Sequence, residues 1–125
     1  MLEIENKNKV LVIRIYEDMW NKGDLAVASE IFARPEGVQR FMSEFLKAFP
    51  DLHHTVEELI AEGDRVVARF SAQGTHNGRW KNFAPSGNPI HYTGVTIAQI
   101  EGEKIVAHHT WWEAMEVVEQ ISGKS

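Results

Sequence analysis

Cysteine is absent from this sequence of 125 residues. The chain can therefore form no disulfide bond and offers no thiolate to a metal ion, and its redox compartment stays undetermined. Apolar runs extend over only a few residues, too short for a membrane-spanning helix, and the acidic stretch Met1–Glu5 lacks a signal-peptide core. We therefore expect a cytoplasmic protein without a membrane partner.

Clusters of basic residues are missing as well. The 13 Lys and Arg residues are outnumbered by 18 Asp and Glu residues, and the net charge is -5. Since proteins bind nucleic acids mainly through clustered basic side chains that neutralise phosphates, this balance argues against a nucleic-acid partner. The sequence also has no glycine-rich phosphate loop and no serine or cysteine nucleophile motif.

The remaining composition is that of one globular domain. Hydrophobic residues make up 43% of the chain and charged residues 25%, which is typical of a soluble protein. A chain of this length can bury roughly two thirds of its unfolded surface around one core. We therefore predict a single domain over residues 1–125, without an internal repeat or linker.

The first half of the chain has helical periodicity. Apolar residues recur every three or four positions from Lys7 to Lys22, and a short helix is expected from Leu25 to Phe32. A third helix follows Pro35, with Phe45 among its inward-facing residues, and ends at Pro50. These helices are expected to cover a sheet.

The second half alternates in the manner of β-strands. Four strands are predicted, at about Leu52–Ala61, Arg65–Thr75, Ile90–Ile100 and Lys104–Glu113. Short glycine-containing connections follow the first and third of them, as antiparallel hairpins require. We therefore predict an α+β fold, a curved antiparallel sheet wrapped by N-terminal helices. The apolar interior of such a cone is where a small ligand would enter.

The last predicted strand combines aromatic and ionisable side chains. Strict alternation places one set on a shared face, namely Ile105, Ala107, His109, Trp111 and Glu113. The other face carries Lys104, Val106, His108, Thr110 and Trp112. An ordinary core strand avoids Glu and His, because burying an ionisable group without partners costs several kcal/mol or shifts its pKa. We therefore expect the first face to line a ligand pocket.

Three further segments, together with this strand, carry a family resemblance. They are Phe49-Pro50-Asp51-Leu52-His53, Ala61-Glu62-Gly63-Asp64-Arg65-Val66-Val67 and Gly74-Thr75-His76-Asn77-Gly78. In this order they resemble the SnoaL-like polyketide cyclase group, its ester cyclase branch included, within the nuclear transport factor 2-like superfamily of α+β cone folds. The resemblance extends from Glu5 to Ile121.

The resemblance implies a cofactor-free enzyme that acts on a small hydrophobic carbonyl compound by acid/base chemistry. Intramolecular aldol cyclisation is the family's named reaction, and isomerisation, dehydration or epoxide hydrolysis stay open. Glu113 matches the position of the family's general acid and base, which is usually Asp, and His109 stands where relatives usually have Trp. Only Ala33-Arg34-Pro35 separates Phe32 from Glu36, where relatives have a longer segment.

Each candidate site residue has a functional and a structural interpretation. Glu113 is expected to move the proton, with His109, His76 or Gln99 polarising the carbonyl. The structural alternatives are a helix-capping carboxylate, a half-buried strand histidine, a loop-ordering histidine and an exposed strand amide, respectively. Four aromatic residues are expected to bind the substrate and exclude water, namely Trp20, Phe45, Trp111 and Trp112.

Histidine is frequent, with six in the chain, yet no metal site is predicted. His108 and His109 point to opposite faces of a strand, and no pair with metal-ligand spacing has a carboxylate nearby. His53 and His54 are adjacent, so only one of them can face the cavity, and the sequence assigns neither a role.

Two classes of function therefore stay open: an acid/base enzyme, and a noncatalytic module of the same fold that binds a small hydrophobic ligand or acts as a dimerising scaffold. Burial of Glu113 beside an open cavity would favour the enzyme, and a cavity filled by side chains would favour the scaffold. In either case the resemblance implies a homodimer. We expect its interface on the outer sheet surface, at Val106, Thr110 and Trp112.

Overall fold

The N-terminal helix changes its winding halfway along. The structure, a computed structural model, describes residues 2–123, and α1 (Leu2–Arg14) continues directly into a π-helix, η1 (Ile15–Trp20). The wider winding shows in the hydrogen bond from Asn21 N to the Tyr16 carbonyl five residues earlier, 2.9 Å long. The recurring apolar residues of this segment turn inward here, since Ile15, Tyr16, Met19 and Trp20 are all buried.

The remaining helices are short and amphipathic. The segment predicted as one helix from Leu25 to Phe32 divides into a 3-10 turn, η2 (Leu25–Val27), and α2 (Ala28–Ile31). Helix α3 (Glu36–Ala48) follows Pro35 as predicted and buries one face. Helix α4 (Ala114–Ser122) follows the sheet and ends at Gly123, whose φ of 76° is the left-handed conformation that glycine adopts without strain.

Four antiparallel strands form one sheet in sequence order, β1-β2-β3-β4. They are β1 (His53–Glu62), β2 (Arg65–Thr75), β3 (Pro89–Glu101) and β4 (Lys104–Trp112), within two residues of the predicted bounds. The β3–β4 hairpin turns at Gly102 and Glu103, with φ values of 56° and 63°. Positive φ at both central residues is the type I′ geometry that matches the twist of the strands.

A β-bulge in β4 exchanges the two faces of that strand. Ile100 pairs with Ile105, but the next pair is Gln99 with Ala107, so Val106 is an extra residue without a partner. Beyond the bulge, His108 pairs with Ala98, a buried residue of the inner sheet face. Because strand side chains alternate with a period of two, the extra residue places even-numbered positions inward after Val106, although Ile105 before it is also buried.

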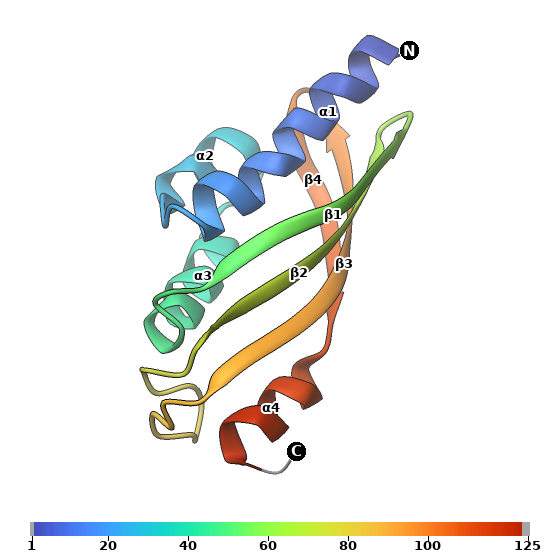
Figure 1. The fold of residues 1–125 in the computed structure, drawn as a ribbon. Helices are drawn as coiled ribbons and strands as arrows, with labels where there is room; N and C mark the ends of the chain where they lie inside the picture. Colours follow the sequence, from blue (N-terminus) through green and yellow to red (C-terminus); the bar gives the residue numbers. More distant parts are fainter. Residues whose placement is uncertain (1, 124–125) are drawn as a thin grey trace.

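The inner face of the sheet is covered by the helices, and its outer face is open (Figure 1). Helix α1 crosses β1 and β2, and α4 lies beside the start of β3. The core lies between these layers and includes buried residues of β2, β3 and β4 and of α1, η1 and α3, and partly buried residues of β1 pack against it. The fold class predicted from the sequence, an α+β cone with a curved antiparallel sheet and N-terminal helices, is confirmed.

Gly94 has no side chain and so leaves space on the inner face of β3. A Cβ atom built there would lie 2.5 Å from the Phe70 ring and 2.6 Å from the Trp111 carbonyl oxygen, so no other residue fits without displacing the backbone. The Phe70 ring fills this space and lines the cavity beside it. A glycine in the middle of a strand therefore marks the floor of the pocket.

Phe45 on α3 should be the most costly helix residue to truncate. It is 2% exposed and packs against the rings of Trp20, Phe49, Trp80, Tyr92 and Trp112. We expect Phe45→Ala to lower the free energy of unfolding by about 3 to 5 kcal/mol, because it removes buried apolar contacts and leaves a cavity. Chemical denaturation measures the change.

Phe41 provides the matched control, one turn earlier on the same helix and 51% exposed. Phe41→Ala should cost well under half as much, since much of its ring already contacts solvent. Equal losses for the two variants would show that Phe45 is not the centre of the aromatic packing.

Candidate functional site

An open pocket lies between the helices and the inner face of the sheet. Its volume is about 590 Å³, and its lining comes from η1, α3 and all four strands. Such a volume is in the range of small-molecule sites. The interior is therefore not filled by side chains. A filled cavity would have favoured a noncatalytic scaffold, and the structure does not show one in the described residues.

Aromatic side chains form most of the pocket wall. Phe45 lies among them, with ring centroids 5.8 Å from Trp20 and 5.6 Å from Trp112, each approached edge to face. Of the four aromatic residues predicted to bind substrate, the structure brings Trp20, Phe45 and Trp112 to the pocket. Trp111 lies outside, 53% exposed.

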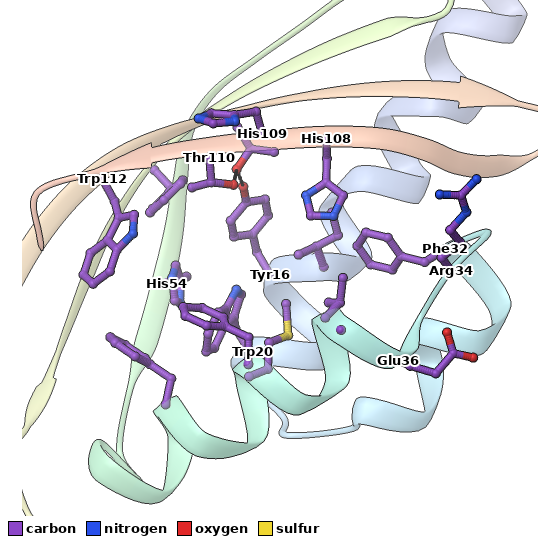
Figure 2. Close-up of a pocket in the computed structure, with 18 of the residues that line it drawn as sticks. Tyr16, Trp20, Phe32, Arg34, Glu36, His54, His108, His109, Thr110 and Trp112 are labelled. Carbon is purple, nitrogen blue, oxygen red and sulfur yellow. Dashed lines mark hydrogen bonds between the residues drawn. The ribbon is translucent and has the colours of Figure 1, made fainter. Parts of the chain in front are cut away.

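The predicted orientation of β4 is wrong beyond its bulge. Figure 2 shows His108, Thr110 and Trp112 pointing from β4 toward the helices, with the His109 ring on the other side of the strand. His109 is among the residues that border the pocket, but its ring packs on Trp111 with centroids 4.1 Å apart. The extra residue Val106 is the cause, because strict alternation from Ile105 does not allow for it.

Glu113 is likewise outside the pocket, and it has a structural partner. Its side chain is exposed, and its Oε1 accepts a hydrogen bond from the Thr93 backbone N–H at 2.8 Å. Its own N–H donates to the Thr93 carbonyl at 3.2 Å. Gln120 bonds both backbone groups of His91 farther along the same edge. Glu113 and Gln120 thus continue the hydrogen bonding of β3 where β4 has ended.

The remaining predicted polar residues also lie away from the pocket. His76 is fully buried, and its Nδ1 accepts from the Ser86 N–H at 3.1 Å and pairs with the Ser86 hydroxyl at 2.9 Å, so it orders the loop before β3. Burial lowers the pKa of His76. Gln99 is on the outer face, where its amide donates to Asp64 at 3.1 Å.

The short connection after Phe32 builds one end of the pocket. Phe32 forms a parallel bridge with Ile105, and its ring meets His108 edge to face with centroids 5.1 Å apart. Arg34 and Glu36 line the pocket where α3 begins, and both are exposed (Figure 2). The pocket therefore has a wall at this end although the segment is shorter than in relatives. Glu36 is the sole carboxylate in the pocket lining of the described residues.

Three hydroxyl groups form a chain across the pocket wall. The Tyr16 hydroxyl on η1 donates to Thr96 Oγ1 on β3 at 2.7 Å, and Thr96 Oγ1 lies 2.7 Å from Thr110 Oγ1 on β4. Burial raises the pKa of Tyr16 to about 12, against the opposing effect of the Thr96 hydrogen bond. Tyr16 therefore remains a neutral donor at physiological pH. Its hydrogen bond also joins the π-helix to the sheet.

His54 and Tyr92 form a second neutral pair. The Tyr92 hydroxyl lies 3.2 Å from His54 Nε2, and His54 stacks on Trp20 with ring centroids 4.8 Å apart. Burial, reinforced by His53, lowers the pKa of His54 to about 3, and burial raises that of Tyr92. Because both groups are neutral, one of them donates to the other, and His54 Nδ1 is left as a buried atom with no partner among the described contacts.

The sequence indicated that two of these residues face inward, but it did not reveal their role in the pocket. His54 follows buried Leu52 by two positions, which is the spacing of one strand face, and Tyr16 belongs to the inward stripe of the first helix. Neither sign distinguishes a pocket residue from a core residue. Tyr92 lies 38 positions from its partner His54, and Thr96 lies 80 positions from its partner Tyr16, so only the fold brings these pairs together.

Metal and membrane features are not apparent in residues 2–123. Within this range no three His, Asp or Glu side chains are grouped closely enough to hold a metal ion. None of the helices described there has both the length and the apolar character that a membrane span needs.

Fold and site together define an α+β cone protein with a small-molecule pocket. The chain belongs to the SnoaL-like polyketide cyclase family, whose model matches residues 10–121. No curated protein matches it significantly.

Several solved structures share the fold at low sequence identity. A candidate SnoaL-like polyketide cyclase from Jannaschia sp. CCS1 has 23% identity over 95% of this chain and 94% of its own, with a TM-score of 0.88. AclR, a candidate hydroxylase from Streptomyces galilaeus, has 23% identity over 95% and 83%, with a TM-score of 0.86. IdmH, a candidate polyketide cyclase from Streptomyces antibioticus, has 23% identity over 92% and 98%, with a TM-score of 0.81.

The buried His54 should make stability depend on pH. Its folded-state pKa of about 3 lies below the ordinary value of 6.5, so below pH 6.5 the unfolded chain takes up a proton that the folded protein does not. Stability is therefore lost as the pH falls from 6.5 toward 3. At pH 4.5, two units below 6.5, this amounts to about 2 to 3 kcal/mol at 1.36 kcal/mol per unit.

Urea denaturation of wild type and His54→Gln at pH 7 and pH 4.5 isolates this contribution. Wild type should lose about 2 to 3 kcal/mol more than the variant, because the variant lacks the titrating ring. His53→Gln, a change at the adjacent exposed histidine, should keep most of the wild-type loss, because burial is the larger cause of the lowered pKa of His54. Equal losses in wild type and His54→Gln would contradict a histidine that stays neutral in the folded protein.

Proposed function

We propose that the pocket binds a small, largely apolar carbonyl compound and that the protein moves a proton at the carbon beside the carbonyl. The supporting observation is an open cavity of about 590 Å³ whose aromatic walls also carry neutral hydrogen-bond donors. Trp20, Phe45 and Trp112 would hold the apolar body of the substrate and exclude water. Cyclase- or isomerase-type chemistry of this kind needs no cofactor and agrees with the family.

His108 is the group best placed to accept the proton. It points into the pocket from β4 and is partly open to solvent. Burial, with a contribution from His109, lowers its pKa, so the imidazole is unprotonated at neutral pH. A general base has to be free of its proton at the working pH and within reach of the substrate. His108 meets both conditions, whereas Glu113, the residue at the family's acid/base position, lies outside the pocket and bonds to the Thr93 backbone.

The reaction would proceed through an enolate. His108 removes a proton from the α-carbon, the electron pair moves to the carbonyl oxygen, and neutral donors in the wall stabilise the charge that develops there. The imidazolium then returns a proton to carbon. In a cyclase the enolate carbon would instead attack a second carbonyl of the same molecule, and the proton would go to the oxygen formed.

Deuterium exchange into 2-tetralone tests this function, because its α-protons are acidic enough to report weak acid/base catalysis. We expect wild type to accelerate exchange in D₂O, followed by proton NMR, and His108→Gln to lower the enzymatic rate by roughly 100-fold, the usual loss for a general base. His109→Gln and Glu113→Gln should stay close to wild type, since the His109 ring points away from the pocket (Figure 2) and Glu113 is not among the residues that line it. Unchanged exchange in His108→Gln would remove His108 from the mechanism.

A noncatalytic binding module is the second candidate. It is favoured by the absence of a carboxylate deep in the described pocket, where Tyr16, His54 and Tyr92 are all neutral. In that case 2-tetralone binds without acceleration of exchange in any variant.

We also propose a homodimer, as the resemblance implies, but with a corrected interface. Thr110 and Trp112 face the pocket, so of the predicted interface residues only Val106 stays outside, 40% exposed. Exposed apolar side chains on the same outer surface are Ile60, Ile97 and Trp111. Such a patch on an open sheet face is typical of a subunit interface.

Sedimentation at micromolar concentration should therefore give twice the 14.2 kDa mass of the chain. Trp111→Asp should shift the protein toward monomer, because it places a charge in the apolar patch. Met115→Asp, a change at a residue 69% exposed on α4, should leave the mass unchanged. A wild-type monomer would contradict the homodimer.

A further inference from the structure

The hydroxyl chain from Tyr16 to Thr110 has a direction. Its first bond, from Tyr16 to Thr96, and its second, between Thr96 and Thr110, are each 2.7 Å long. Each hydroxyl has one proton, so three hydroxyls in a row can point their protons one way or the other. The two directions differ in which terminal hydroxyl, that of Tyr16 or that of Thr110, has a proton without an acceptor.

Burial decides between them. Tyr16 is 2% exposed and Thr96 is 4% exposed, and neither hydroxyl has another hydrogen-bond partner among the described contacts. If the protons pointed toward Tyr16, its O–H would be a buried donor without an acceptor, which is costly. If they point toward Thr110, every buried hydroxyl donates, and the unpaired proton belongs to the end of the chain.

That end lies in the pocket. Thr110 is exposed, lines the cavity and is flanked on the same strand face by His108 and Trp112 (Figure 2). Its oxygen already accepts from Thr96, and its own proton is available to a ligand. Tyr16 cannot reverse the order by losing its proton near neutral pH, since its pKa is about 12.

We propose that Thr110 is a specificity-determining residue: its hydroxyl donates to a neutral oxygen acceptor of the ligand and so selects carbonyl compounds over hydrocarbons of the same shape. This proposal rests on the proposed function for the location of the ligand and adds the atom that recognises its oxygen. The apolar body of the ligand lies against Trp20, Phe45 and Trp112, where shape alone does not distinguish a ketone from a hydrocarbon.

Fluorenone and fluorene make a direct test. They share one rigid tricyclic skeleton, and fluorenone replaces a CH₂ group by a carbonyl. Fluorenone has no proton on the carbons beside its carbonyl that a base can remove, so its binding does not depend on proton transfer. We expect wild type to bind fluorenone about tenfold more tightly than fluorene in a fluorescence titration, the scale of one net hydrogen bond.

Thr110→Val should abolish this preference, because valine has the same shape without the hydroxyl. Fluorenone binding should weaken, and fluorene binding should stay unchanged. Thr110→Ser should keep the preference. Thr55→Val, the same change at an exposed position on β1 outside the pocket, should match wild type. A merely structural role for Thr110 would alter the binding of both probes together.

Two results overturn the proposal. One is a wild type that binds neither probe or shows no preference between them. The other is a Thr110→Val variant that retains the wild-type preference, which would show that a different group recognises the carbonyl oxygen. Failure of the proton-transfer function is a separate result: exchange into 2-tetralone is then absent while the fluorenone preference and its loss in Thr110→Val persist.

Discussion

One unpaired residue in β4 determines which side chains of that strand line the pocket. Before Val106, Ile105 packs into the core and bridges to Phe32. After it, the side chains that reach the pocket are those of His108, Thr110 and Trp112. Without the bulge, continued alternation from Ile105 would turn His109 and Trp111 inward. A single inserted residue thus serves two needs, a closed core at one end of the strand and a polar pocket wall along the rest.

The wall that results is polar without being charged. Aromatic side chains surround Tyr16, His54 and Tyr92, and this burial raises the pKa of the tyrosines and lowers that of the histidine. In each case the neutral form is favoured, because a charged group would lose its hydration among apolar rings. The interior can therefore offer hydrogen bonds to a ligand without the cost of an uncompensated charge. Arg34 and Glu36 carry their charges at the exposed end of the pocket, where α3 begins.

Membership of the SnoaL-like family establishes the fold of this chain more firmly than its chemistry. Structures with TM-scores of 0.81 to 0.88 include proteins named as candidate cyclases and one named as a candidate hydroxylase. One fold evidently accommodates different reactions, and the pocket lining has to distinguish them. Here Glu113 closes the edge of β3 instead of entering the pocket, and the side chains that do enter come from β4 beyond its bulge.

The sequence by itself determined the order and limits of the four strands. Alternation located all of them to within two residues, and glycine turns joined the hairpins, because these signals arise between neighbours in the chain. The aromatic residues Trp20 and Phe45 could be assigned to the interior for the same reason. Only the tertiary structure decided which side of β4 faces the pocket, since the bulge depends on pairing with β3 and leaves no mark in the local pattern. It alone also joined Tyr16 to Thr96 and His54 to Tyr92, because hydrogen bonds between residues 80 and 38 positions apart form only after the sheet and the helices have packed together.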